Sequence, residues 1–223
     1  MKSLNVFTAT VVTAVAFATA AHAQERWCDP LKGFYANGGV GVNIMPDIKS
    51  SSPGTAFRTS TDVGERISLA VGYMVPLAKK TSIGLEFETG AIVNSLDKAS
   101  MNGAGGSGSV NLEGYYYQLP FLVNGVLVCN AVPRWSFYAG AGGGGVYSRF
   151  HLHRFDGTRV DSNQEETSGA FQLMGGARYQ LNQWSEVGIA YKYLAVFVQD
   201  IQLGNDTETV QNHAVVATYT YHF

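Results

Sequence analysis

The amino-acid sequence predicts an all-β protein, namely an eight-stranded antiparallel transmembrane up-and-down β-barrel. Three observations lead to this fold class. Eight segments alternate residue by residue between apolar side chains and polar or small ones, which is the period of a β-strand. One face of these segments carries charged residues, and the other carries most of the aromatic ones. The connections between the segments are alternately long and short, as in outer-membrane barrels.

The amino terminus predicts export. Lys2 precedes an apolar run from Val6 to about Ala21, and Ala21-His22-Ala23 has the small-x-small form of a cleavage site. We therefore expect a signal peptide at residues 1–23 and a barrel domain at residues 24–223.

The composition after the signal peptide narrows the class of protein. The chain has 15 basic and 17 acidic residues, and only Lys2 lies in the signal peptide, so the net charge stays mildly negative. This charge gives no reason to expect nucleic acid as a partner. No later run approaches the roughly 20 apolar residues of a transmembrane helix, so any membrane crossing must use strands.

The first four strands are expected at residues 33–44, 65–75, 82–93 and 110–127. In the first, apolar and small residues at even positions alternate with tyrosine, asparagine and glycine. In the other three, aliphatic and aromatic residues fall mainly on odd positions. Pro120 lacks a backbone donor, so we expect a bulge or a local break there.

The last four strands are expected at residues 135–147, 170–181, 186–198 and 212–223. The strand at 135–147 alternates least, because it contains AGAGGGGV, and its glycines suggest strong bending or room for bulky neighbours. The final strand keeps His213, Val215, Ala217 and the terminal aromatics on one face. In a soluble sandwich or barrel this face would need a protein partner, whereas in a bilayer it contacts lipid.

The sorting of charges favours the bilayer. Six charged residues fall on the face that lacks most aromatics: Arg66, Glu86, Glu88, Arg178, Glu186 and Lys192. A soluble barrel would place such residues outside. The interior of an eight-stranded barrel is just wide enough for side chains to fill it, so three cations and three anions predict an interior ion-pair network. The alternative is that the same six residues line a narrow or gated ion path.

The connections predict which end of the barrel is which. Long links at residues 45–64, 94–109, 148–169 and 199–211 alternate with short ones. Outer-membrane barrels place long loops outside the cell and short turns in the periplasm. Cys28 and Cys129 then share the periplasmic end, where an oxidising compartment could join them in a disulfide; the alternative is two separate thiols.

Neither a metal site nor an active site is predicted. His151 and His153 could share a strand face, but metal ligation needs three or four groups, and no third ligand is evident. We expect no cofactor. An enzyme acting on lipid A would need a serine and a histidine on the lipid face. His213 is the only histidine expected there near the loops, and the His-x-Ser arrangement of a lipid A deacylase is absent.

The expected barrel resembles the small outer-membrane barrels of the OmpA-like and opacity-type porin family of surface proteins. The matching segments are GFYANGGVGVNI, YYYQLPFLVNGVLV, FYAGAGGGGV, LMGGARYQL and YTYHF. The resemblance implies a location in the cell outer membrane, with lipid and lipopolysaccharide around the barrel. It also implies that the barrel-assembly machinery reads the terminal aromatics, which Tyr219, Tyr221 and Phe223 match. The sequence departs from OmpA in lacking a periplasmic peptidoglycan-binding domain.

We expect a structural or surface-interaction protein, adhesion- or antigen-like, that meets a host or surface ligand through its long loops. The alternative is a narrow porin that passes ions or small solutes. A lipid A-modifying enzyme is the second alternative.

Overall fold

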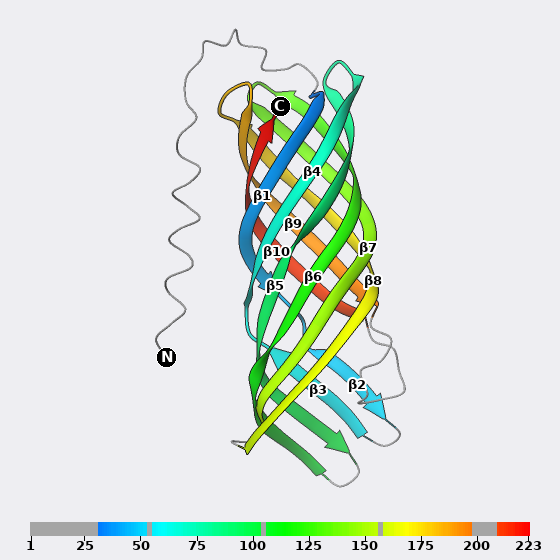
Figure 1. Ribbon diagram of the computed structural model, residues 1–223, viewed down its shortest axis with the longest axis vertical. Coiled ribbons are helices and arrows are strands. Elements are labelled where there is room, and N and C mark those ends of the chain that lie inside the picture. Colours follow the sequence, from blue (N-terminus) through cyan, green and yellow to red (C-terminus); the bar gives the residue numbers. More distant parts are fainter. Residues whose placement is uncertain (1–30, 53–54, 104–105, 156–157, 198–208) are drawn as a thin grey trace.

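The computed structural model describes residues 31–52, 55–103, 106–155, 158–197 and 209–223 (Figure 1). The expected signal peptide and Cys28 lie outside these ranges. Within them, no helix is long and apolar enough to cross a membrane. The strands are β1 Gly33–Ile44, β2 Ile48–Ser52, β3 Thr55–Thr61, β4 Gly64–Ala78, β5 Thr81–Gly103, β6 Gly106–Val132, β7 Trp135–Phe155, β8 Thr158–Gln180, β9 Ser185–Phe197 and β10 Thr209–His222.

Eight of these strands close a ring in the order β1-β4-β5-β6-β7-β8-β9-β10, and β10 pairs with β1. Every pairing is antiparallel. The predicted fold class is therefore confirmed. Figure 1 shows a tall barrel whose strands lean across its long axis.

The register determines the width of the barrel. The partners of Gly33 can be followed from strand to strand through Met74, Gly84, Val126, Gly140, Met174, Lys192 and Ala214. The path returns to β1 at Asn43, which is ten residues further along the same strand. A stagger of this kind goes with strands tilted by about 35–45°, and eight such strands leave room inside for side chains only.

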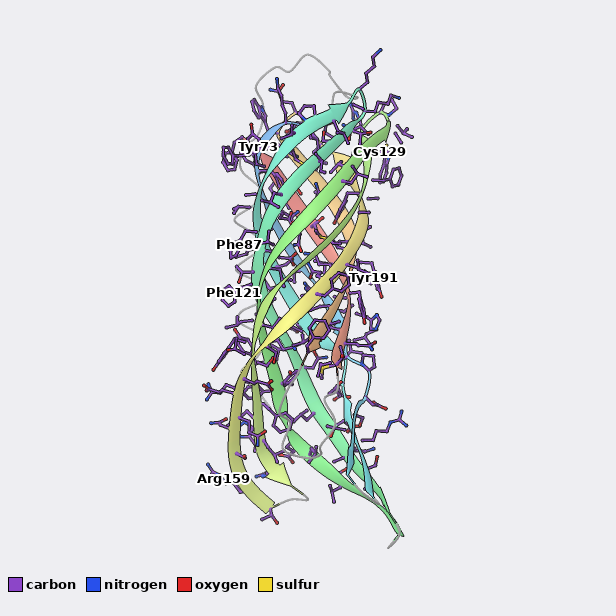
Figure 2. The ribbon with its side chains drawn as sticks, turned by 90° about the vertical axis from the view of Figure 1, so that its right-hand side faces the viewer. Tyr73, Phe87, Phe121, Cys129, Arg159 and Tyr191 are labelled. Carbon is purple, nitrogen blue, oxygen red and sulfur yellow. The ribbon has the colours of Figure 1, made fainter. Side chains whose placement is uncertain are left out.

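The outside of the barrel is apolar. Leu69 and Val71 of β4 are 59% exposed, and Phe87 of β5 is 46% exposed. Figure 2 shows Phe87 and Phe121 pointing away from the barrel. We call this outward surface the lipid-facing band, which includes Val40, Val42, Ile67, Leu69, Val71, Leu85, Phe87, Phe121, Val123, Leu173, Ile189 and Val215.

The two ends of the barrel differ in length. The β4–β5, β6–β7 and β8–β9 links are short, and the carboxy terminus lies at this end, which we call the turn end (Figure 1). At the other end, β5 to β8 run on for a total of 21 to 27 residues each. Crossing a bilayer takes only about 9–11 residues of a tilted strand. The excess forms a projecting sheet of residues 94–103, 106–114, 150–155 and 158–168, together with β2 and β3, and β3 pairs with β5.

One sequence expectation is corrected here, and another is met in one of its two forms. Most of the links expected as loops at 94–109 and 148–169 are strand, and the link at 45–64 contains the β2–β3 hairpin. At Pro120 the structure shows the expected local break and no bulge. The register of β5 on β6 is the same at Thr89↔Phe121 and at Ile92↔Gln118, but no partners are assigned between these pairs. The register shifts of these strands lie instead in the projecting sheet and at the β6–β7 turn.

Candidate functional site: the barrel interior

The six charged residues singled out in the sequence all lie inside the barrel. They come from β4, β5, β8 and β9, and each is at most 3% exposed. Strand alternation explains this placement, because five of them have an exposed apolar neighbour on the outer face, and Arg178 lies between the half-buried Ala177 and Tyr179.

Glu88 is the centre of the interior network. Its Oε1 accepts hydrogen bonds from Lys192 Nζ at 2.6 Å and from Arg66 Nη2 at 3.1 Å. Its Oε2 accepts from Gln172 Nε2 at 2.7 Å and from Asn124 Nδ2 at 3.0 Å. Two cations and two amides from β4, β6, β8 and β9 therefore meet at one carboxylate of β5, and the interaction joins strands on different sides of the barrel.

Glu86 continues the network toward the turn end. Its Oε2 accepts a hydrogen bond from the hydroxyl of Tyr35 at 2.9 Å, and its Oε1 lies 3.4 Å from the Asn124 amide, which is shared with Glu88. The two buried glutamates thus have donors of their own and one in common. The amides and the tyrosine were not identified as members of the network from the sequence.

A second group of charges lies beside the turn end. Arg178 Nη1 and Glu186 Oε2 are 3.8 Å apart, and His222 Nε2 is 3.2 Å from the same oxygen. The Arg178 guanidinium also stacks over the Tyr138 ring at 4.1 Å, a cation–π contact. The three cations and three anions therefore form two groups rather than one continuous chain of charges.

Apolar side chains fill the interior on both sides of the Glu88 network. Toward the projecting end the buried cluster contains Met45, Ile92, Leu96, Leu112, Tyr116, Leu122, Val146, Ala170, Leu194, Val196 and Val210. Toward the turn end a second cluster contains Met74, Val126, Val128, Tyr138 and Met174. Ile92 and Leu96 follow Glu88 along β5, away from its turn, and the buried Asn94 lies between them. Apolar side chains interleaved with buried amides therefore fill the interior between Glu88 and the projecting end.

The other residues named from the sequence lie outside this interior. Cys129 is exposed on the outer face of β6. The disulfide with Cys28 stays a prediction, since Cys28 is outside the described residues. His151 Nε2 lies 3.2 Å from His153 Nδ1 on β7. Among the described residues, no group of three or more His, Cys, Asp or Glu side chains could hold a metal ion.

The terminal aromatics lie on the outward face of β10. Tyr221 and Phe223 are exposed and their rings contact each other at 5.2 Å. The Tyr219 hydroxyl is 2.9 Å from Ser185 Oγ. His213, on the same face, has its Nδ1 2.6 Å from the Tyr191 hydroxyl and its ring against Tyr193. Among the described residues, these contacts bring neither a serine hydroxyl nor a carboxylate to His213.

Residues 9–223 match the family model of the outer membrane protein beta-barrel domain. The chain belongs to this family. Its resemblance to the small outer-membrane barrels is thereby confirmed, and the family indicates the outer membrane as its location.

Solved structures show the same fold. Neisserial surface protein A is 15% identical, with a TM-score of 0.50, over 86% of this chain and 97% of that one. The outer membrane protease OmpT from Escherichia coli is 9% identical, with the same TM-score and coverage. OprG from Pseudomonas aeruginosa is 16% identical, with a TM-score of 0.49, over 89% of this chain and 99% of that one. No curated protein matches the sequence.

Proposed function

We propose that this outer-membrane barrel is a structural or surface-interaction protein, adhesion- or antigen-like, whose interior is closed to ions. One observation carries the proposal. The barrel interior is filled with side chains, whereas four strands extend beyond the barrel into the projecting sheet.

The filled interior supports closure. The four donors on Glu88 lie within 3.1 Å, so both oxygens of this mid-barrel carboxylate already have partners. An ion would have to displace them and then pass the side chains of the apolar cluster, where it would lose much of its hydration. The equal numbers of buried cations and anions also differ from the single-sign rings that select ions in open pores.

The projecting sheet supports a role in surface contact. β6 has 27 residues, of which the bilayer needs fewer than half. Ordered strands present a more defined surface than flexible loops. Less conformational entropy of this surface is therefore lost when a partner binds. A host molecule or another surface ligand is the class of partner that this end of the molecule would meet.

Two further assignments are part of the proposal. The barrel-assembly machinery would read Tyr219, Tyr221 and Phe223, which is consistent with the exposure of the last two beside the turn end. Catalysis is not proposed: OmpT is a protease, but at 9% identity the likeness concerns the fold alone. A lipid A-modifying role would further require a nucleophile beside His213.

Single-channel conductance in a planar bilayer tests the proposal. Three proteins would be refolded: the parent chain from residue 24, its Arg178→Ala variant and its Glu86→Ala variant. Circular dichroism and heat-dependent gel mobility would verify that each is folded. We expect the parent protein to be electrically silent. Discrete current steps in the parent protein, changed by either substitution, would establish the narrow-porin alternative instead.

A further inference from the structure

A groove on the outer surface of the barrel lies just where the projecting sheet begins. It encloses about 400 Å³ and is lined by Ser95 of β5, by Glu113, Gly114 and Tyr115 of β6, by His153 and Arg154 of β7, and by Arg159 of β8. None of these residues belongs to the interior network.

Three register shifts meet at this groove. The β5–β6 register shifts between Leu96 and Lys98, the β6–β7 register between Glu113 and Gly114, and the β7–β8 register between Leu152 and Arg154. A bulge bends its strand and re-aims the side chains beside it, and bulges concentrate at barrel rims and binding sites. Three adjacent ladders that change register at one place explain why the outer surface is hollowed there.

The groove combines cations with rings. Among the described residues that line it, there are two guanidiniums, one imidazole and one carboxylate. Arg154 Nη1 lies 3.1 Å from Glu113 Oε2, and both side chains are more than half exposed. An exposed pair of this kind is weak, so Glu113 orients the guanidinium without preventing it from binding another anion. The fork of an arginine matches two oxygens of a phosphate group.

The rings of Tyr115 and His153 line the groove beside these cations, and the His151 ring packs against both of them from outside the lining. The Tyr115 ring lies 5.1 Å from the His151 ring, which in turn lies 4.1 Å from the His153 ring. Such a wall suits the apolar face of a sugar next to a phosphate. Inorganic phosphate would need no wall of this kind.

The position of the groove relative to the lipid-facing band indicates the occupant. Phe121 and Val123 belong to this band, and Tyr115 and Glu113 follow them on the same outward face of β6. At about 3.3 Å per residue, Tyr115 lies roughly 20 Å along the tilted strand from Phe121, at the level where acyl chains give way to headgroups. Arg159 lies toward the projecting end, as Figure 2 shows.

We propose that this groove binds a phosphate-bearing sugar headgroup of an outer-leaflet glycolipid, the chemistry that lipopolysaccharide presents. The proposal rests on the membrane orientation in the proposed function, with the projecting sheet outside the cell. It deepens the lipid partnership that the resemblance implies by assigning it to particular residues. Arg154 and Arg159 would contact phosphate, and Tyr115 with His153 would contact the sugar.

The test measures binding to the full barrel chain folded in detergent. The probes are purified lipopolysaccharide, the same material after enzymatic dephosphorylation, and inorganic phosphate. We expect intact lipopolysaccharide to bind most tightly. The double variant Arg154→Gln/Arg159→Gln should bind it roughly tenfold more weakly or worse, the size expected for lost charge-assisted hydrogen bonds. Arg154→Lys retains the positive charge without the two-pronged guanidinium. Its affinity for lipopolysaccharide should lie between those of the parent protein and the double variant.

The matched control removes the same charge from the other end of the barrel. Lys79→Gln/Lys80→Gln changes two exposed cations in the β4–β5 turn and should bind lipopolysaccharide like the parent protein.

Heat-dependent gel mobility verifies that every variant is folded. Equal losses in both double variants would overturn the proposal, because binding would then follow net charge. Tight binding of inorganic phosphate that excludes lipopolysaccharide would replace the glycolipid with a free anion. Binding and conductance are separate readouts, so either proposal can fail alone.

Discussion

Glu88 shows at the scale of a single residue how the interior is stabilised. Its carboxylate is fully buried, and a buried charge is tolerated only when opposite charges and hydrogen bonds replace its water. Arg66 and Lys192 supply the charge, while Gln172 and Asn124 supply further donors to the second oxygen. Removing the carboxylate would leave both cations in the barrel without their common partner.

We therefore predict that Glu88→Ala lowers the free energy of unfolding by about 3–5 kcal/mol, the usual cost of breaking a buried ion pair from one side. Urea unfolding of the protein refolded into lipid vesicles measures this. Asp47→Ala is the control, because Asp47 also pairs with an arginine, Arg58, but on the exposed β2–β3 side. An exposed pair contributes only about 0–1 kcal/mol. Equal losses in the two variants would mean that the interior network stabilises no more than a surface pair.

The membership of the network was only partly predictable from residue types. Alternation alone places the six charged residues on the inner face. It does not say that Glu88 meets Lys192, since β5 and β9 are separated by three other strands on either route round the ring, through β4, β1 and β10 or through β6, β7 and β8. Contacts across a barrel depend on the stagger of all eight ladders, which no single strand reveals. In the sequence, Leu122 and Leu194 look like interruptions of the polar inner face. In the structure they are fully buried members of the interior apolar cluster.

The glycine-rich strand β7 has a physical reason at the scale of the element. A Cβ on an inward glycine would fall against β6: at Gly142 it would meet the carbonyl oxygen of Val123 and Oδ1 of Asn124, and at Gly144 the carbonyl oxygen of Phe121. At the outward Gly145 the nearest atom would be 3.9 Å away. On the inner face, these glycines therefore allow the backbone of β6 to approach closely, whereas the sequence had suggested strong bending or room for bulky neighbours.

Substitutions on β7 should therefore alternate in effect. Gly142→Ala must displace backbone atoms of β6, and we predict a loss of about 1–3 kcal/mol, the usual cost of overpacking. Gly145→Ala adds the same methyl group on the outer face and should leave the urea midpoint nearly unchanged. The same vesicle unfolding assay compares the two. A similar midpoint for both variants would show that β6 and β7 can separate without cost at this position.

The strands themselves were predictable only where a membrane surrounds them. There, one face meets lipid and the other the interior, so apolar and polar residues must alternate. In the projecting part of β8, residues 158–168 read TRVDSNQEETS, with polar residues on both faces. Water on both sides removes the pattern while leaving the strand in place. The same reason explains why the sequence shows no alternation for β2 and β3.

The molecule as a whole is a barrel with one short end and one long end. This asymmetry implies an orientation, because outer-membrane barrels have short turns in the periplasm and longer connections on the cell surface. The lipid-facing band lies between the two ends, and the proposed glycolipid groove lies at its border with the projecting sheet. Both proposals therefore depend on the same orientation, which can be measured directly.

Cysteine labelling on intact cells tests this orientation. Gly108 lies near the tip of the β5–β6 hairpin, and a Cβ there would meet no atom within 4 Å, so Gly108→Cys should fold normally. Lys79→Cys places the same thiol in the exposed β4–β5 turn. With Cys28 and Cys129 both changed to serine, a membrane-impermeant maleimide should label Gly108→Cys on intact cells and Lys79→Cys only after the outer membrane is opened. Labelling of Lys79→Cys alone on intact cells would show that the barrel has the opposite orientation. The projecting sheet would then face the periplasm, where no outer-leaflet glycolipid could reach the groove.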